Sequence, residues 1–544
     1  MVIKYNEIEK IWSAPESEVG EKWNSCSLGE AILTKLHEDN PERVLEVFYD
    51  MGIQLTVGDI LRQTITVAQN FQRLGLRKGD TVLLYSVSNE KVTPIVFACY
   101  TIGAPINFFE TKLEGGDIST IIQQVDPAII IFEEKYRSRL FKALESINLQ
   151  NLKHVLSLGS EAPSVDEVLF AACGAIESFQ IPTIENPMTH PATLMLTSGT
   201  TGLPKIILHS HSFMIRGIFS WWQLKSSDRV FCFSPLRWIS QVSMMLNPVF
   251  YECQRFYTSQ DPSGPLGKHI IETCKITHFF TTPAMYSAIL KASENSSSSL
   301  SSMKRALVGG EVVTDALLDD MLRLMPKCRP LHSYGMTEFA GLVASDEGID
   351  RKKCANGMAL RNGFMAKFID ENNKPLGPNK MGRLCMKRTS LPYLKYLKND
   401  KANRESFLEG GWLNTGDYGF MDSMNMLHIV MRYKDLVRSE GNIIIPSEVE
   451  KKLESHPSVS LAVLAGHPNP NKPNDEIATV FVVLKNGSIS TNIQNDLQEF
   501  MKTNCTKEEV KAVRHFKVVS NMPLTSCGKI DRNALQIMAS KACK

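Results

Sequence analysis

Hydrophobic and polar positions in an early part of the chain follow helical spacing and strand-like spacing in turn. Residues 57–74 carry apolar side chains at helical spacing and end near Gly75, and residues 92–102 form an apolar helix that closes at Gly103. Between them, residues 81–85 have the length and composition of a buried strand. This alternation predicts layers of helices and largely parallel strands, which is an α/β fold.

Later segments continue this pattern and then depart from it. Strand-like apolar runs recur at 128–132, 154–158 and 277–280. After about residue 365 the chain changes to short polar strands and turns. This change predicts a small, mostly antiparallel and β-barrel-like subdomain over about 365–433.

The last part of the chain has the pattern of a separate α+β unit. A helix is expected over 446–456, followed by strands and further helices. The charged stretch 432–435 precedes this unit and suits a hinge. We therefore predict a multidomain α/β protein with a large N-terminal domain, residues 1–433, and a small mobile C-terminal domain, residues 434–544.

Composition narrows the class of protein. A chain of 544 residues is expected to form two or more domains, because a single core stops growing at about 250–300 residues. The formal net charge of +2 gives no reason to expect nucleic acid or an anionic membrane as a main partner. No apolar segment approaches the ~20 residues of a membrane helix, so no stable membrane insertion is expected.

The chain ends and the cysteines bear on the cellular compartment. The N-terminus has no apolar signal region, and the 12 scattered cysteines are typical of reduced thiols in a reducing compartment. The last residues, Ala542, Cys543 and Lys544, do not match a peroxisomal Ser-Lys-Leu signal. We expect a cytoplasmic protein, with the peroxisome as the alternative.

The segment TSGTTGLPK, residues 197–205, is the most informative stretch for function. Its hydroxyls, glycines and lysine are Thr197, Ser198, Gly199, Thr200, Thr201, Gly202 and Lys205. Backbone N–H groups near glycines, hydroxyls and an ammonium group all suit a phosphate. The alternative is an ordinary turn between a strand and a helix. A GxxxxGK[ST] P-loop is excluded because Gly202 lies three residues before Lys205 and Ile206 follows the lysine.

Two further segments suit a nucleotide. In SYGMTE, residues 333–338, the ring of Tyr334 can stack on a base, and the carboxylate of Glu338 can hold Mg²⁺ near phosphates. In VGGE, residues 308–311, paired glycines after an apolar strand leave bare backbone on which a flat ring could lie. A turn with a buried tyrosine is the alternative for the first segment.

Three segments nearer the C-terminus add polar groups. Asp417, in the glycine-flanked segment 411–419, could accept hydrogen bonds from both ribose hydroxyls, or it could form an Asx turn. The segment 432–441 is a basic loop that ends in glycine, and a solvated charged turn is its alternative. Lys529 follows a glycine in a loop near the C-terminus, where a lone lysine more often faces solvent.

Together, these segments resemble the adenylate-forming superfamily of acyl-CoA synthetases, coumarate-CoA ligases and beetle luciferases. The resemblance runs from roughly residue 50 to 540. It implies a reaction in two halves, with ATP, Mg²⁺ and coenzyme A as cofactors. A carboxylate attacks the α-phosphorus of ATP to give acyl-AMP and pyrophosphate, and the thiolate of coenzyme A then displaces AMP.

The resemblance also implies roles for matching residues. By resemblance, the residues that bind the cofactors are Thr197, Ser198, Gly199, Thr200, Thr201, Gly202, Gly309, Gly310, Glu311, Ser333, Tyr334, Gly335, Asp417, Arg432, Arg438 and Gly441. The catalytic set is Lys529, Thr337, Glu338 and Lys205. Within these sets, Thr197 to Lys205 would hold the β- and γ-phosphates, and Tyr334 and Gly309 to Glu311 would flank adenine.

The remaining roles concern the metal, the ribose and the movement of the small domain. Thr337 would contact the α-phosphate and Glu338 would bind Mg²⁺, while Asp417 and Arg432 would bind ribose. Lys434 would be the hinge of the small domain. Lys529 would bridge the carboxylate and the α-phosphate during adenylation. For thioester formation, Lys529 would move away, and Arg438 to Gly441 would approach coenzyme A.

The chain departs from the family pattern at several positions. Ile206 replaces a glycine, Arg383 replaces a glutamate, and Arg438 replaces a lysine on which luciferase-like oxidation relies. Light emission is therefore not expected, because arginine does not readily lose a proton. Arg237 and Trp238 stand where relatives carry a histidine that gates the acyl pocket. Trp238 is either a gate or a core residue, and Arg237 could pair with a carboxylate or a phosphate.

The acyl pocket is expected to draw on 213–247, 307–312 and 334–343. Its apolar candidates are Phe213, Phe219, Trp221, Trp222, Met244, Met245 and Leu246. They favour a fatty or aromatic acid, and we predict an ATP-dependent acid–CoA ligase for a medium- or long-chain fatty acid. The alternatives are an adenylating enzyme with another acceptor, and a binding or scaffold protein with a decayed site.

Overall fold

The computed structural model of the protein describes most of the chain. The described residues are 3–16, 23, 25–161, 163–197, 204–221, 223–294, 300–311, 313–349, 357–473, 475–485, 492–523 and 530–542. Among them, no helix is long and apolar enough to cross a lipid bilayer.

The chain divides into two compact units. Unit 1 comprises Met1–Ala366, Met386–Leu413 and Ser423–Leu427, and unit 2 comprises Lys367–Cys385, Asn414–Asp422 and His428–Lys544. The predicted domain boundary between residues 433 and 434 falls within unit 2 and stays a prediction.

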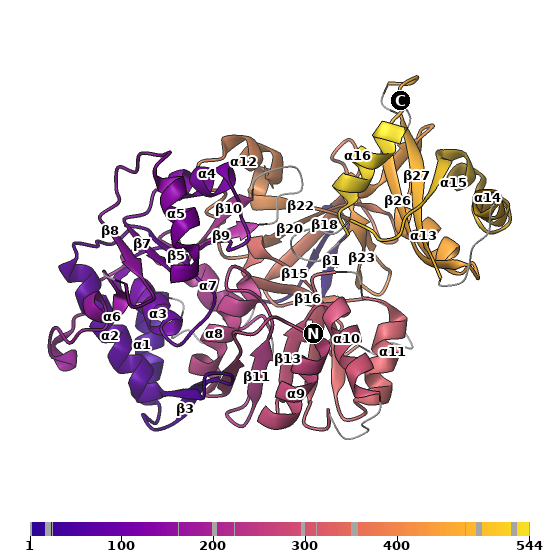
Figure 1. Cartoon of the computed structure of the whole chain (residues 1–544). Helices are drawn as coiled ribbons and strands as arrows, with labels where there is room; N and C mark the ends of the chain where they lie inside the picture. The colour runs from indigo at the N-terminus through magenta and orange to yellow at the C-terminus, as the bar shows by residue number, and fades with distance from the viewer. Residues whose placement is uncertain are drawn as a thin grey trace. The chain divides into compact units, whose positions relative to one another are not determined.

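Unit 1 contains a six-stranded sheet with the strand order β10-β9-β6-β5-β7-β8 (Figure 1). The strands are β5 (Val82–Tyr85), β6 (Ile106–Phe108), β7 (Ile129–Phe132), β8 (His154–Ser157), β9 (Pro191–Thr197) and β10 (Lys205–Ser210). All neighbours are parallel except β9 and β10, which pair antiparallel. Three strands expected from apolar runs are present as β5, β7 and β8.

Helices cover both faces of this sheet because its strands are apolar on both sides. Val82 and Leu84 belong to the core that contains α1 (Leu28–Glu38), α2 (Val57–Arg73) and α3 (Val92–Ile102). Leu83 and Tyr85 belong to the core under α4 (Gly116–Val125) and α5 (Arg137–Leu144). The alternation follows from the period of two along a strand.

A nine-stranded sheet in unit 1 has the order β17-β16-β15-β14-β13-β11-β12-β3-β4. Its strands are β3 (Val44–Phe48), β4 (Ile53–Thr56), β11 (Arg229–Cys232), β12 (Gln254–Tyr257), β13 (His278–Thr281), β14 (Arg305–Gly309), β15 (Arg329–Met336), β16 (Gly341–Ser345) and β17 (Ala359–Leu360). The strands from β15 to β3 are parallel, and antiparallel pairs close both ends.

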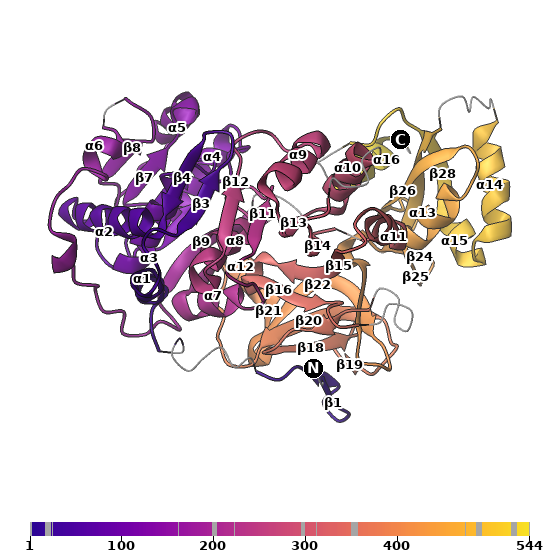
Figure 2. The same ribbon diagram turned by 90° about the horizontal axis from the view of Figure 1, so that it is seen from below.

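Helices also cover both faces of the nine-stranded sheet. Figure 2 shows α9 (Gly264–Cys274), α10 (Pro283–Ser293) and α11 (Asp315–Leu324) side by side along one face. Towards the other face lie α7 (His211–Ile218) and α8 (Ile239–Tyr251), which share a core with α1, α2 and α3. The helices between the two sheets therefore belong to one continuous core.

A sheet with antiparallel strand pairs forms the β-rich part of the chain. An eight-stranded sheet has the order β1-β2-β18-β20-β22-β21, with β19 beside β18 and β23 beside β22. The strands are β1 (Lys4–Asn6), β2 (Ile11–Ser13), β18 (Phe364–Ile369), β19 (Pro375–Leu376), β20 (Gly382–Arg388), β21 (Phe407–Leu408), β22 (Trp412–Met421) and β23 (Leu427–Arg432). Strands β18, β20 and β22 each have residues in both units.

The C-terminal part of unit 2 is an α+β structure around a three-stranded sheet, β26-β27-β28. Its elements are β24 (Val437–Ser439), β25 (Asn442–Ile444), α13 (Pro446–Glu454), β26 (Val459–Pro468), β27 (Glu476–Leu484), α14 (Ile493–Asn504), α15 (Lys507–Ala512), β28 (Val513–Val518) and α16 (Arg532–Ala542). Helices α13, α14 and α15 pack on one face and α16 packs on the other (Figure 2). The predicted multidomain α/β fold class is confirmed.

The close packing of α1 on α3 generates a stability prediction. A Cβ atom added at Gly29 would lie 2.3 Å from Thr101 Cα and 2.4 Å from the Tyr100 carbonyl oxygen, so backbone would have to move. We expect Gly29→Ala to lower the free energy of unfolding by about 1–3 kcal/mol in urea titrations. Gly116→Ala is the matched control: it lies at the start of α4, and no described atom is within 4 Å of its added Cβ. An equal loss in both variants would contradict the prediction.

Candidate active site

The TSGTTGLPK segment joins two antiparallel strands. Thr197 ends β9 and Lys205 begins β10, and the two residues are directly paired in the sheet. The segment therefore does not lie between a strand and a helix, as its ordinary-turn alternative assumed. Five predicted cofactor-binding residues lie outside the described residues: Ser198, Gly199, Thr200, Thr201 and Gly202.

A tyrosine connects two of the predicted catalytic residues. The Lys205 ammonium lies 4.9 Å from the centre of the Tyr396 ring, which is a cation–π distance. The Tyr396 hydroxyl donates a 2.8 Å hydrogen bond to Glu338 Oε1. Both Tyr396 and Glu338 are buried. Lys205 and Glu338 are 133 positions apart in the sequence, and Tyr396 brings them into one cluster.

The position of Tyr396 depends on backbone pairing with β10. The amide of Leu397 donates to the carbonyl of Ile206 at 2.8 Å, and Tyr396 is bridged to Ile207. Tyr396 was not among the predicted site residues. It stands in a lysine-rich stretch, KYLK, where neither spacing nor periodicity separates it from other buried tyrosines.

Two basic side chains bind the turn that carries Glu338. This turn is the short helix η4 (Thr337–Phe339), which follows β15 directly. His209 Nε2 lies 2.8 Å from the Thr337 carbonyl oxygen, and Arg388 Nη2 donates to the Phe339 carbonyl at 3.3 Å. The turn is therefore held at its first and third carbonyl groups.

Burial keeps His209 neutral. It lowers the pKa of His209 from 6.5 to about 4, because the protein interior disfavours the charged imidazole. Nδ1 has no hydrogen-bond partner among the described residues, whereas Nε2 faces a carbonyl oxygen. This arrangement assigns the proton to Nε2, which donates to Thr337.

The predicted adenine-binding segments lie side by side at the ends of two parallel strands. Gly309 in β14 pairs with Ser333 in β15, and Ser333 Oγ donates to the Val308 carbonyl at 3.0 Å. A Cβ at Gly309 would lie 2.7 Å from Ser333 Oγ, so this close approach requires glycine. The structure thus brings these segments together: Gly309, Gly310 and Glu311 with Ser333, Tyr334 and Gly335.

Arg237 and Trp238 lie at the start of α8. The guanidinium of Arg237 forms an ion pair with Glu110 and lies 5.6 Å from the Trp238 ring centre. Arg237 therefore has a carboxylate partner within the chain. Trp238 is the N-cap residue of α8 and is only half-buried, so it is not one of the fully buried core residues.

Most of the predicted apolar pocket residues belong to the packed core. Phe213, Trp221, Met244, Met245 and Leu246 are each at most 3% exposed. They lie within hydrophobic clusters between helices and sheets, and their assignment to the pocket lining stays a prediction. Hydrophobicity alone does not separate core residues from pocket residues. Phe219 is half-buried, and Trp222 lies outside the described residues.

In unit 2, the two predicted ribose-binding residues contact each other. Asp417 in β22 is buried, and its Oδ1 lies 3.2 Å from Nε of Arg432 at the end of β23. Arg432 also donates to the Thr415 carbonyl at 3.1 Å. Lys434 follows in the short helix η6 (Tyr433–Asp435), where its ammonium lies 3.4 Å from Asn533 Oδ1.

Two of the arginines that depart from the family pattern, Arg383 and Arg438, lie near the same tyrosine. The guanidinium of Arg383 lies 5.4 Å from the Tyr433 ring centre and that of Arg438 lies 4.6 Å from it. The Tyr433 hydroxyl bonds to Glu371, and burial raises the pKa of Tyr433. Gly441, predicted to approach coenzyme A with Arg438, has a φ of +79° in the turn between β24 and β25.

The last predicted site residues are Glu338, which would bind the metal, and Lys529. No group of three or more His, Cys, Asp or Glu side chains that could hold a metal ion occurs in the described part of the chain. Glu338 is a single buried carboxylate, and one or two carboxylates with substrate phosphates are a usual Mg²⁺ site. Lys529, the predicted adenylation lysine, lies outside the described residues.

Tyr396→Phe tests the link between Tyr396 and Glu338. The variant keeps the ring under Lys205 but removes the donor to a buried carboxylate, so we expect a loss of about 1.5–3 kcal/mol in unfolding free energy. Tyr49→Phe, which removes a surface hydroxyl from His269, should change stability by less than about 0.5 kcal/mol. Urea unfolding measures both, and similar values for the two variants would contradict the assignment.

His209 should make stability depend on pH. The unfolded chain binds a proton at His209 near pH 6.5, whereas the folded protein resists protonation down to about 4. This difference in pKa adds up to about 3 kcal/mol to the free energy of unfolding above pH 6.5, and the added stability is lost as the pH falls towards 4. Buried His211 and His278 shift in the same direction.

His209→Gln keeps a donor for Thr337 and cannot be protonated in this range. The variant should therefore lose less stability than the wild type between pH 7 and pH 5, measured by urea unfolding at each pH. The exposed His37→Gln serves as the control and should follow the wild-type slope. Identical slopes for all three proteins would exclude a contribution from His209.

Comparisons with known proteins agree with this geometry. A model of the AMP-binding enzyme family matches residues 35–392, and a model of the AMP-binding enzyme C-terminal domain matches residues 448–529. A 4-coumarate–CoA ligase of Humulus lupulus is 24% identical over 506 residues, which cover 89% of either chain. A 2-succinylbenzoate–CoA ligase of Oceanobacillus iheyensis is 25% identical over 515 residues, covering 92% of this chain and 98% of that protein.

Solved structures share the fold. The ATP-bound structure of MatB from Rhodopseudomonas palustris superposes with a TM-score of 0.83 at 19% identity, covering 95% of this chain and 100% of that one. The named relatives support the predicted class of enzyme, an acid–CoA ligase. Because the enzyme-family model matches more than half of its length, the chain belongs to the AMP-binding enzymes, the adenylate-forming superfamily that its motifs resemble.

Proposed function

We propose that the protein is an ATP-dependent acid–CoA ligase that forms AMP. In the first half-reaction, a carboxylate oxygen attacks the α-phosphorus of ATP, and pyrophosphate leaves as acyl-AMP forms. In the second, the thiolate of coenzyme A attacks the acyl carbon, and AMP leaves with the bonding electrons. The single observation that carries the proposal is the cluster of Lys205, Tyr396 and Glu338 at the end of the phosphate-binding segment.

Charge is the physical reason for this cluster. An anionic carboxylate must approach an anionic phosphate chain, so cations near the phosphoryl oxygens stabilise the transition state. Tyr396 offers its ring to the Lys205 ammonium, which limits the positions that the flexible lysine adopts. We assign Lys205 to the departing phosphates and Thr337 to the α-phosphate. Lys529, by family resemblance, bridges the carboxylate and the α-phosphate.

Mg²⁺ fits the residues that are present. Glu338 is a buried carboxylate with one oxygen bonded to Tyr396, and a carboxylate has lone pairs for further ligands. The hydroxyl of Tyr396 therefore orients the carboxylate without occupying all of its acceptor sites. When bound, Mg²⁺ would supply Lewis-acid stabilisation of charge on the phosphate oxygens.

The ribose and coenzyme A would be bound by residues of unit 2. Asp417 accepts from Arg432, and this ion pair orients a carboxylate that can accept hydrogen bonds from ribose hydroxyls. Lys434 would be the hinge at the 433/434 domain boundary, about which the small domain turns between the half-reactions. Arg438 and Gly441 would then approach coenzyme A.

Of the three substrates, the acid is the one whose chemical identity is least determined by the residues described above. The two relatives described above are named for coumarate and succinylbenzoate, and neither is a fatty acid. Most of the apolar side chains that suggested a fatty acid are packed in the core. We therefore favour a compact or aromatic acid, and the medium- or long-chain fatty acid remains a prediction to be tested beside it.

A second candidate is an adenylating enzyme that uses another acceptor. Arg438 stands where relatives carry a lysine, and its guanidinium lies on the Tyr433 ring. Its guanidinium stays charged, because arginine does not readily lose a proton, and it is larger than the ammonium of the lysine it replaces. In this alternative, the first half-reaction proceeds and coenzyme A does not consume the acyl-AMP.

Purified protein with ATP, Mg²⁺, coenzyme A and a panel of aromatic, short and fatty acids tests the proposal. We expect acid-dependent release of pyrophosphate and AMP, with an acyl-CoA product detected by mass spectrometry. No pyrophosphate with any acid would sink the proposal. Acyl-AMP that accumulates in the presence of coenzyme A would instead identify the second candidate.

Two variants separate the half-reactions. Glu338→Gln and Lys529→Ala should each slow acid-dependent pyrophosphate release by about 10²–10³-fold, comparable to the loss of one transition-state donor. Lys529→Ala should still convert synthetic acyl-AMP and coenzyme A to thioester, because its assigned role ends with adenylation. Lys502→Ala, at an exposed position on α14, is the control and should retain both activities. Equal loss of both half-reactions in Lys529→Ala would contradict its role.

A further inference from the structure

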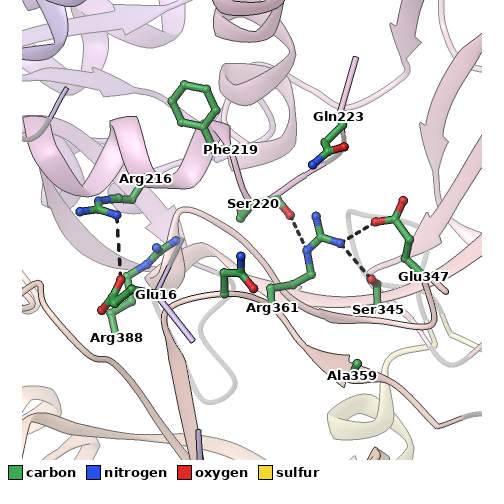
Figure 3. Close-up of a pocket in the computed structure, with 11 residues that line it drawn as sticks. Glu16, Arg216, Phe219, Ser220, Gln223, Ser345, Glu347, Ala359, Arg361 and Arg388 are labelled. Atoms are coloured by element: carbon green, nitrogen blue, oxygen red, sulfur yellow. Dashed lines mark hydrogen bonds and ion pairs between the residues drawn. The ribbon is translucent and has the colours of Figure 1, made fainter. Parts of the chain in front are cut away.

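A pocket of about 290 Å³ lies in unit 1, and one of its lining residues, Arg388, also bonds to the turn that carries Glu338 (Figure 3). Its lining includes three arginines, Arg216, Arg361 and Arg388, and two glutamates, Glu16 and Glu347. The ring of Phe219 provides an apolar wall. This lining is more basic than that of a pocket built for an apolar acyl chain, so its charges call for an explanation.

The charges fall into two groups. Arg361 is fully engaged: it pairs with Glu347 at 2.7 Å and donates to the Ser220 carbonyl at 3.1 Å. At the other end of the pocket, Figure 3 shows Arg216 and Arg388 near each other beside Glu16. Arg216 lies 3.9 Å from Glu16, at the edge of ion-pair distance. Among the described residues, two guanidinium groups thus lie near one carboxylate.

Arg388 is the unusual member of this group. It is 7% exposed, and its guanidinium lies 4.4 Å from the ring centre of Phe364 and 5.1 Å from that of Phe213. One hydrogen bond leads to the Phe339 carbonyl, and Nε has no hydrogen-bond partner among the described residues. No carboxylate of the described residues lies within ion-pair distance of it. A buried cation without a paired anion is costly.

Burial and the neighbouring Arg216 lower the pKa of Arg388 to about 10, so it stays charged at neutral pH. Glu16 supplies one negative charge near these two guanidinium groups, and its carboxylate also accepts a hydrogen bond from Thr389 and is partly exposed to solvent. Glu347 is bound to Arg361, and among the described lining residues three guanidinium groups stand against two carboxylates. An added anion would be stabilised there.

We propose that this pocket binds the carboxylate group of a small organic acid between Arg388 and Arg216. A planar guanidinium matches a carboxylate through two parallel N–H···O bonds. The volume lies at the small end of ligand pockets, so the organic part is compact. The Phe219 ring offers an apolar surface for an aromatic or short aliphatic body.

The carboxylate has two possible sources. Arg216, Phe219 and Ser220 come from the segment predicted to line the acyl pocket, which favours a second carboxylate at the far end of the acid substrate. A separate small acid would present the same group to the same arginines. Arg388 also bonds to the turn of Thr337 and Glu338, so either occupant would contact a residue that supports this turn. Only the choice between sources rests on the proposed function.

Binding of benzoate without ATP tests the pocket itself, by titration calorimetry at low salt. Benzamide is the matched probe, since it has a similar shape and no charge. We expect benzoate to bind and benzamide to bind at least tenfold more weakly. Arg388→Gln and Arg216→Gln should each weaken benzoate binding by about tenfold or more. Glu16→Gln should strengthen it, because it removes the competing carboxylate.

Two variants should weaken benzoate binding and Glu16→Gln should strengthen it, so a general loss of folding cannot explain the whole result. If Arg388→Gln does not fold, Glu16→Gln and Arg216→Gln still decide the outcome. Arg323→Gln, which breaks an exposed ion pair on α11, is the control and should leave binding unchanged. Benzoate binding that none of the three pocket variants alters, equal binding of benzamide, or equal binding of inorganic phosphate would each overturn the proposal.

Turnover then identifies the source of the carboxylate. If it belongs to the acid substrate, benzene-1,4-dicarboxylate should be adenylated, and Arg388→Gln should raise its KM about tenfold while leaving the KM of benzoate unchanged. If it belongs to a separate molecule, benzoate should bind the pocket without competing with the adenylated acid. Either result supports the pocket. Absence of pyrophosphate release with every acid would overturn the proposed function while leaving the binding result intact.

Discussion

The hydrogen bond from Tyr396 to Glu338 is the contact on which the candidate site of unit 1 depends. It joins three segments that are distant in sequence: the start of β10, the turn after β15, and the stretch at 395–397. The ring of the same tyrosine lies under Lys205. A carboxylate and an ammonium that would otherwise sample many positions are thereby placed by one rigid aromatic side chain, which loses little entropy when it is ordered.

Arginine is used in two different ways in this chain. Arg237, Arg361 and Arg432 each pair with a carboxylate of the protein, and Arg383 and Arg438 lie on Tyr433. Their charges are therefore compensated or dispersed over an aromatic face. Arg388 is buried, and its guanidinium lies near the rings of Phe213 and Phe364 without a carboxylate partner among the described residues.

Much of the fold could be predicted from the sequence, because buried parallel strands and amphipathic helices impose distinct periods on the chain. Residues of the glycine and hydroxyl motifs lie on strands: Thr197 ends β9, Gly309 ends β14 and Ser333 lies within β15. Tyr396 could not be found in this way, since its partners are set by the pairing of 395–397 with β10 rather than by local spacing. The sequence could not separate pocket from core either, because Met245 and Leu246 are as apolar in a core as in a pocket.

The direct pairing of Thr197 with Lys205 has an evolutionary consequence. Side chains alternate between the faces of a strand, so one residue added within β10 would turn every later side chain of that strand to the opposite face. Length variation within β9 or β10 should therefore be selected against among descendants of this chain.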